Sequence, residues 1–137
     1  MDNAVARYCA ASEANDMQAL AATFAADVEL PSPLFGSIKF RGSRDVKAVL
    51  SAVYALLGKV SWEEPIGSSQ ARVAVAHARF FGIRIDDAMV FELDAEDRIR
   101  LIRPHLRPLF ATIVFALVLG LRVARHPSVI IRALRSG

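Results

Sequence analysis

The chain has 137 residues, of which 54% are apolar and 23% are charged, which is enough to bury the core of one compact domain. A single cysteine, Cys9, excludes a disulfide framework and a cysteine-based zinc site. No segment shows the basic and then apolar pattern of a signal peptide, so we expect a cytoplasmic protein.

Charge is divided unevenly along the chain. Residues 1–97 hold nine Lys or Arg and all fourteen Asp and Glu, whereas residues 98–137 hold eight Arg and no acid. A basic terminus suits an anionic partner, such as a membrane surface, nucleic acid or an acidic subunit face. The same arginines would also keep an apolar terminal segment in solution, and the composition is compatible with both interpretations.

The first part of the chain alternates helical patterns with short strands. Tyr8 and Cys9 lie on one apolar helical stripe, and Asn15 can cap the helix that follows. Gly42 and Gly58 bound the longest amphipathic pattern. Together these patterns predict helices at residues 2–14, 16–24 and 44–57, and strands at residues 28–30 and 37–40.

After Gly58 the apolar period changes from helical to two, which is typical of strands. The predicted strands are residues 60–65, 71–81, 83–93 and 98–107. Gly82 and the turn at residues 94–97 join the last three strands as hairpins. Helices followed by consecutive hairpins indicate an antiparallel α+β domain.

The order of these elements, together with several local strings, resembles the NTF2-like superfamily, which holds ketosteroid isomerase, limonene epoxide hydrolase and the SnoaL-like polyketide cyclases. The resemblance covers roughly residues 4–107. It is carried by Arg7-Tyr8, Asn15-Asp16, Phe24-Ala25-Ala26-Asp27-Val28, Gly36-Ser37, Gly42, and the hairpin from Phe91-Glu92-Leu93-Asp94 to Arg98-Ile99.

The resemblance implies an α+β cone, in which a curved antiparallel sheet wraps round the long helix and encloses a deep apolar pocket. It also implies a small apolar ligand and frequent homodimerisation through the sheet. We therefore expect an NTF2-like, SnoaL-like domain at residues 1–107 and an apolar, basic helical extension at residues 108–137.

Known catalytic sets of the superfamily carry over only in part. Tyr8 matches the oxyanion-binding tyrosine of the isomerases, but Ser32 stands where their base is expected and Met89 where their second acid is expected. The positions used by the epoxide hydrolases correspond to His77, Arg79 and Pro104. We therefore expect that neither chemistry is retained.

Strand alternation predicts which residues face the pocket. On residues 71–81, His77 and Arg79 are expected to point inward, and Ala74, Ala76 and Ala78 are expected on the opposite face. On residues 83–93 the inward residues are Ile85, Asp87, Met89, Phe91 and Leu93.

These residues predict a polar cluster in the pocket. In it His77 is a general acid or base polarised by Asp87, and Arg79 anchors a carboxylate or a developing oxyanion. Tyr8 donates a hydrogen bond, and Met89 and Phe91 contact the ligand. The alternative is a satisfied hydrogen-bond network with a structural role only. His105 and His126 lie among arginines, so no metal site and no cofactor are expected.

The extension contains an uncharged run at residues 108–121, which is shorter than a membrane span. Such a helix must be covered by its own domain, by a partner subunit or by lipid. Nucleic acid ranks last, because the arginines alternate with aliphatic residues and not with aromatic ones. The sequence thus predicts a small-molecule-binding domain, with an enzyme of the SnoaL-like type as the finer possibility. The alternative is a non-catalytic module for partner binding or peripheral membrane contact through residues 108–137.

Overall fold

The computed structural model describes residues 2–34 and 36–136. Its helices are α1 (Ala4–Glu13), α2 (Met17–Ala21), α3 (Ser43–Leu56), α4 (Leu109–Val123) and α5 (Pro127–Ser136). Its strands are β1 (Phe24–Pro31), β2 (Lys39–Arg41), β3 (Ser61–Trp62), β4 (Ile66–Gly67), β5 (Ala71–Phe80), β6 (Ile83–Leu93), β7 (Ile99–Arg103) and β8 (Leu106–Arg107).

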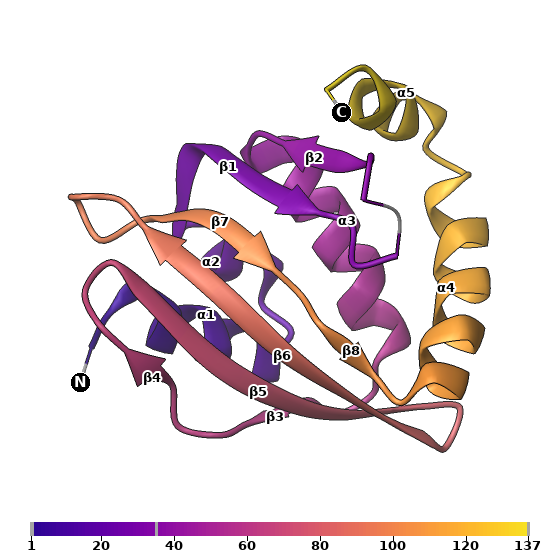
Figure 1. Cartoon of the computed structure of the whole chain (residues 1–137), viewed down its shortest axis with the longest axis horizontal. Helices are drawn as coiled ribbons and strands as arrows, with labels where there is room; N and C mark the ends of the chain where they lie inside the picture. The colour runs from indigo at the N-terminus through magenta and orange to yellow at the C-terminus, as the bar shows by residue number, and fades with distance from the viewer. Residues whose placement is uncertain (1, 35, 137) are drawn as a thin grey trace.

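The strands form one curved sheet in the order β2-β1-β7-β6-β5-β3, with β4 beside β5 and β8 beside β6. Figure 1 shows α3 behind this sheet, α4 along its open side, and α5 folded back beside β2. The predicted α+β cone is confirmed. One detail differs, because β1 and β7 pair in parallel while the other pairs are antiparallel.

Side-chain caps fix the first two helices. The Asn3 side chain accepts a hydrogen bond from the Ala6 N–H at the start of α1. Asp16, and not Asn15 as predicted, caps α2 by accepting from the Ala19 N–H. Asn15 instead adopts a positive φ of 55°, a conformation that Asn tolerates better than most residues, in the short link between the helices.

The turn between β5 and β6 sets the register of the central hairpin. Phe81 and Gly82 have φ values of 49° and 78°, as a two-residue turn of the type I′ kind requires. Phe80 therefore pairs with Ile83, and the ladder continues to the pairs Ala76–Asp87 and His77–Asp86. Paired residues share a face of the sheet, so His77 and Asp87 lie on opposite faces.

The C-terminal helices pack against the cone with one face each. Ala111 and Phe115 of α4 are buried, and the Phe115 ring lies edge-on to Phe80 at a centroid distance of 5.3 Å. On α5, Arg132 donates two hydrogen bonds to the carboxylate of Asp45 at the start of α3, at 2.7 and 2.8 Å. The extension therefore forms one wall of the cone.

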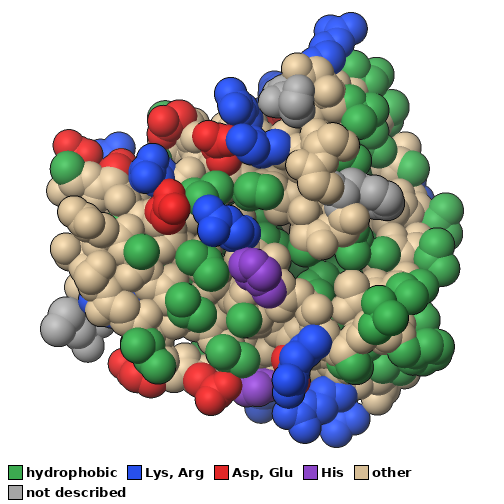
Figure 2. All heavy atoms as spheres, viewed as in Figure 1, with side chains coloured by type: hydrophobic (Ala, Val, Ile, Leu, Met, Phe, Trp, Pro, Cys, Tyr) green, Lys and Arg blue, Asp and Glu red, His purple; other side chains and the backbone are tan. Residues whose placement is uncertain are grey.

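The opposite face of α4 carries large apolar side chains that remain exposed. We call these residues the α4 stripe: Leu109, Phe110, Ile113, Leu117 and Leu121. Figure 2 shows hydrophobic side chains gathered along this side of the molecule. Within the described residues no single helix is long and apolar enough to cross a membrane, and α4 and α5 reach that length only as a pair bent by 109°.

Candidate functional site

An apolar cavity of about 280 Å³ lies between the sheet, α3 and the C-terminal helices. A recess floored by hydrophobic side chains is visible on the face shown in Figure 2. Its walls come from β1 and the segment after it, from α3, from β6 to β8, and from α4 and α5. The described lining residues are Leu30, Pro31, Ser32, Pro33, Leu34, Ile38, Phe40, Val49, Leu50, Val53, Asp87, Met89, Pro104, Leu106, Phe115, Ala116, Leu119, Gly120, Val123, Ile130 and Ala133.

Asp87 is the one ionisable side chain among those described lining residues. Its Oδ1 accepts a hydrogen bond of 3.0 Å from the backbone N–H of His105, and no other described residue donates to the carboxyl group. Burial raises the pKa of Asp87 to about 6, although the His105 N–H opposes that shift. The Asp87 carboxyl group can therefore be protonated or ionised at pH values close to neutral.

Tyr8 lies behind the cavity, in an aromatic cluster, and not in the cavity wall. Its hydroxyl is 2.8 Å from the hydroxyl of Tyr54 and 3.8 Å from the sulfur of Met89. Burial holds the pKa of Tyr8 well above its usual range. Phe91 belongs to the same cluster, with its ring centroid 5.0 Å from that of Tyr8.

Met89 joins this cluster to the cavity. It lines the main cavity and also a small void of about 20 Å³ whose walls include Tyr54 and Asp87. Of the binding residues predicted from the sequence, Met89 thus contacts the cavity, whereas Tyr8 and Phe91 support it from behind. One tyrosine hydroxyl donates to the other, and the Met89 sulfur is a further acceptor for Tyr8, so neither hydroxyl depends on a ligand for a partner.

His77 and Arg79 lie on the outer face of β5, so the predicted cluster of His77, Arg79 and Asp87 does not form. His77 Nδ1 is 2.8 Å from Asp86 Oδ1, and His77 Nε2 is 3.0 Å from Glu63 Oε2. Its hydrogen bond to Asp86 raises the pKa of His77, and the same bond lowers the pKa of Asp86. Arg79 Nη1 donates to the carbonyl of Gly82 at 3.2 Å.

The inward face of β5 is instead the one with Ala74, Ala76 and Ala78, which are all buried. These small side chains leave room for α3 and for the cavity next to it. The predicted inward face of β5 is therefore wrong, because the alternation is shifted by one residue. The predicted inward face of β6 is correct. Pro104 and Leu106 also face the cavity.

The residues of α4 and α5 that line the cavity could not be predicted from the sequence. Phe115 and Leu119 follow the buried Ala111 at intervals of four residues and make up the inner face of α4. That spacing was available in the uncharged run, but the run is apolar on every face, so periodicity alone could not select it. Within the described chain, no group of three or more His, Cys, Asp and Glu could hold a metal ion.

Comparisons with known proteins show similar structures but only low sequence identity. No protein-family model matches the chain, and no curated protein matches it. An uncharacterized protein with a cystatin-like fold from Silicibacter pomeroyi DSS-3 superposes with a TM-score of 0.86 at 18% identity, covering 95% of this chain and 93% of that one. This coverage extends the likeness beyond residue 107, into the C-terminal helices.

Two further solved structures show the same arrangement. A steroid delta-isomerase from Pseudomonas aeruginosa gives a TM-score of 0.81 at 17% identity, covering 91% of this chain and 92% of that one. An NTF2-like protein of unknown function from Cytophaga hutchinsonii gives 0.61 at 11% identity, covering 77% and 88%. At these identities the comparisons establish the fold alone. The chain therefore has the NTF2-like cone fold.

Proposed function

We propose that this protein binds a small apolar molecule carrying a carbonyl group, and that the ligand lies in the cavity with its oxygen beside Asp87. The carrying observation is an apolar cavity of about 280 Å³ with one carboxyl group in its wall. Cavities of this size with few polar groups are typical of small-molecule sites. In its protonated form Asp87 can donate a hydrogen bond to the carbonyl oxygen of a ligand, because the described residues give the carboxyl group only one contact, from the His105 N–H to Oδ1.

Neighbouring positions on α4 provide a matched test of the location. Ala116 lines the cavity, whereas Leu117 is 67% exposed on the α4 stripe. With methyl octyl ketone as the probe in calorimetric titration, Ala116→Phe should abolish binding because the new ring fills the cavity. Leu117→Phe should bind as the wild type does. Equal binding by both variants would place the ligand elsewhere.

The finer proposal is a proton-transfer reaction at the carbon next to the carbonyl group. A carboxylate with a pKa of about 6 can take a proton near neutral pH and return it, as general acid–base catalysis requires. In deuterium oxide, the C–H proton would pass to the Asp87 carboxylate while the electron pair of that bond moves to the carbonyl oxygen, forming an enolate. After the proton on Asp87 exchanges with solvent, Asp87 would return a deuteron to the same carbon, which restores the ketone and the carboxylate. Deuterium incorporation into methyl octyl ketone, followed by NMR, should occur with the wild type and stop with Asp87→Asn. Equal incorporation by both proteins would exclude Asp87 as the base.

A second candidate function is contact with an anionic membrane surface through the α4 stripe. The observation that favours it is an exposed row of large apolar side chains in a segment, residues 98–137, that contains eight Arg and no acid. Arg122 and Arg125 lie near the C-terminal end of this row, where they would attract anionic lipid.

A further inference from the structure

A second hollow lies beside the apolar cavity, in the corner where α4 meets α5. It is a groove of about 310 Å³ above α3, lined by Ala48, Val49, Ser51, Ala52, Arg122, Val123, Arg125, His126 and Val129. Val49 and Val123 line both this groove and the apolar cavity, so the two spaces share a wall.

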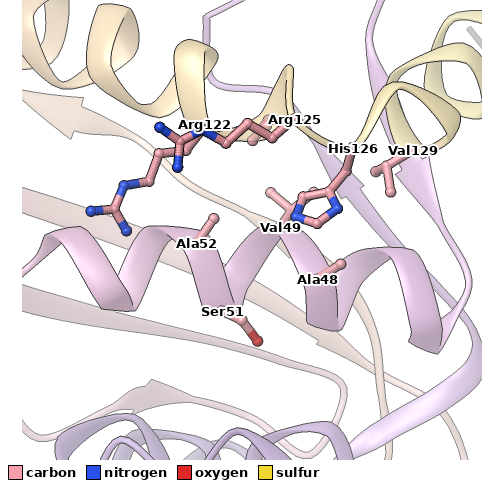
Figure 3. A pocket seen from close by; sticks show the side chains of 9 residues that line it. Ala48, Val49, Ser51, Ala52, Arg122, Arg125, His126 and Val129 are labelled. Carbon is pink, nitrogen blue, oxygen red and sulfur yellow. The ribbon is translucent and has the colours of Figure 1, made fainter.

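The groove is basic. Figure 3 shows Arg122 and Arg125 extending to the same side of the groove above Ala52, with His126 over the neighbouring turn of α3. The lining contains no Asp or Glu, and neither arginine forms an ion pair with a described residue. Ser51 is neutral, and its hydroxyl donates to the backbone carbonyl of Lys47.

Arg122 and Arg125 are both exposed and extend to the same side of the groove, so an anion between or beside their guanidinium groups would be attracted by both. Guanidinium groups bind carboxylates through paired hydrogen bonds, and the apolar floor formed by Ala48 and Ala52 offers no competing acceptor side chain. The groove can therefore hold a carboxylate. Its position next to the apolar cavity suits a molecule that has both an apolar chain and an anionic end.

We propose that the ligand is an amphiphile, with its apolar chain in the cavity and a carboxylate in the groove at Arg122 and Arg125. This proposal rests on the proposed function, since it gives the chain the same cavity. It adds a second recognition point and a chemical class of ligand, namely medium-chain carboxylates that also carry a carbonyl group in the chain, for Asp87.

Three probes separate the contribution of the apolar chain to binding from that of the carboxylate, in calorimetric titration at neutral pH and low salt. Decanoate has the chain and the carboxylate, decanol has the chain alone, and acetate has the carboxylate alone. Decanoate should bind roughly tenfold more tightly than decanol, as expected for two partly exposed ion pairs. Acetate should show no measurable binding, and high salt should weaken only the binding of decanoate.

The double variant Arg122→Gln/Arg125→Gln should bind decanoate no better than decanol and leave decanol binding unchanged. Arg98→Gln, at the far hairpin between β6 and β7, is the matched control and should bind all three probes as the wild type does. The salt dependence of the wild type tests the proposal without any variant. If decanol binds as tightly as decanoate, or if high salt leaves decanoate affinity unchanged, the anionic site is wrong and the cavity still stands. If neither chain-bearing probe binds and methyl octyl ketone does not bind either, the proposed function itself fails.

Discussion

At the level of single residues, the Asp87 carboxyl group is costly to ionise, because burial in the cavity wall raises its pKa to about 6. Between the ordinary pKa of an aspartate and this value, the folded protein binds more protons than the unfolded chain. Stability therefore falls as the pH rises through this window, and the penalty is complete above it.

Asp87→Asn should remove this penalty while keeping an oxygen that accepts from the His105 N–H. We expect the variant to exceed the wild type in unfolding free energy by roughly 2 kcal/mol at pH 7 and to match it near pH 4. Urea unfolding at both pH values measures the difference. A gap that does not change with pH would show that Asp87 is not the titrating group.

Phe81 combines two unfavourable features at the tip of the β5–β6 hairpin. Its φ of 49° belongs to the left-handed region, and its side chain is 78% exposed. Phe81→Asn would create the Asn-Gly pair that this turn favours, at the loss of a ring contact with Phe80 at 4.6 Å. We expect a net gain of about 0.5 kcal/mol, seen as a higher Tm. Phe81→Ala, which lacks the preference for positive φ, should show no gain.

The same turn explains why the predicted cluster of His77, Arg79 and Asp87 does not form. Two residues in a tight hairpin fix the pairing of every position along both strands, so that His77 must oppose Asp86. Gly82 predicts the turn, and Asp87 and Met89 predict the inward face of β6. Taken together, the turn and this face place the alanines of β5 on the inside. Residue type favoured the opposite assignment, because valines alternating with a histidine are more typical of a pocket wall than alanines are.

At the level of elements, α5 is held to the rest of the cone by the ion pair between Arg132 and Asp45. The Asp45 side chain is almost fully buried, and its hydrogen bond from Arg132 lowers the pKa of Asp45. A lowered pKa contributes stability at neutral pH that is lost as the pH falls through the folded-state value. The attachment of α5 should therefore weaken in acid.

Arg132→Leu should lower the protection factors of the α5 backbone amides at neutral pH, and acidification should then lower them little further. In the wild type the same loss of protection should appear only below about pH 4. Hydrogen exchange followed by mass spectrometry resolves both effects. Arg135→Leu, at an exposed position of the same helix, serves as the control. Protection of α5 that is identical in all three proteins would mean that apolar packing alone holds the helix.

The element prediction was most accurate where one periodicity dominated. The helix predicted at residues 44–57 is observed as α3 at Ser43–Leu56, and the strands at 71–81 and 83–93 are β5 and β6. The contacts of α4 were not predictable, because a helix apolar on all sides gives no moment from which to choose its inner face. Three-dimensional packing makes that choice, by placing Phe115 against Phe80.

At the level of the whole molecule, the α4 stripe is the surface that an external partner would cover. Ile113→Gln combined with Leu117→Gln should reduce sedimentation with anionic vesicles while leaving the fold intact, because both side chains are at least half exposed. High salt should weaken wild-type binding by screening the arginines. Ile66→Gln, exposed on β4, is the control.

Two other results would count against the membrane. If the wild type stays in the supernatant with anionic vesicles at low salt, lipid does not cover the stripe. If size-exclusion chromatography shows a dimer that the double variant converts to a monomer, a second copy covers it, and the homodimer expected from the family resemblance would then form through α4.

The attachment of α4 and α5 also has a kinetic consequence. These two helices form one wall of the cavity, so a bound ligand can leave only when this wall opens. Binding and release would then share the same opening step. A change in that step would alter the association and dissociation rates in the same direction and leave the dissociation constant nearly constant. Loosening the Arg132–Asp45 pair should thus shorten the residence time of a ligand without weakening its affinity in proportion.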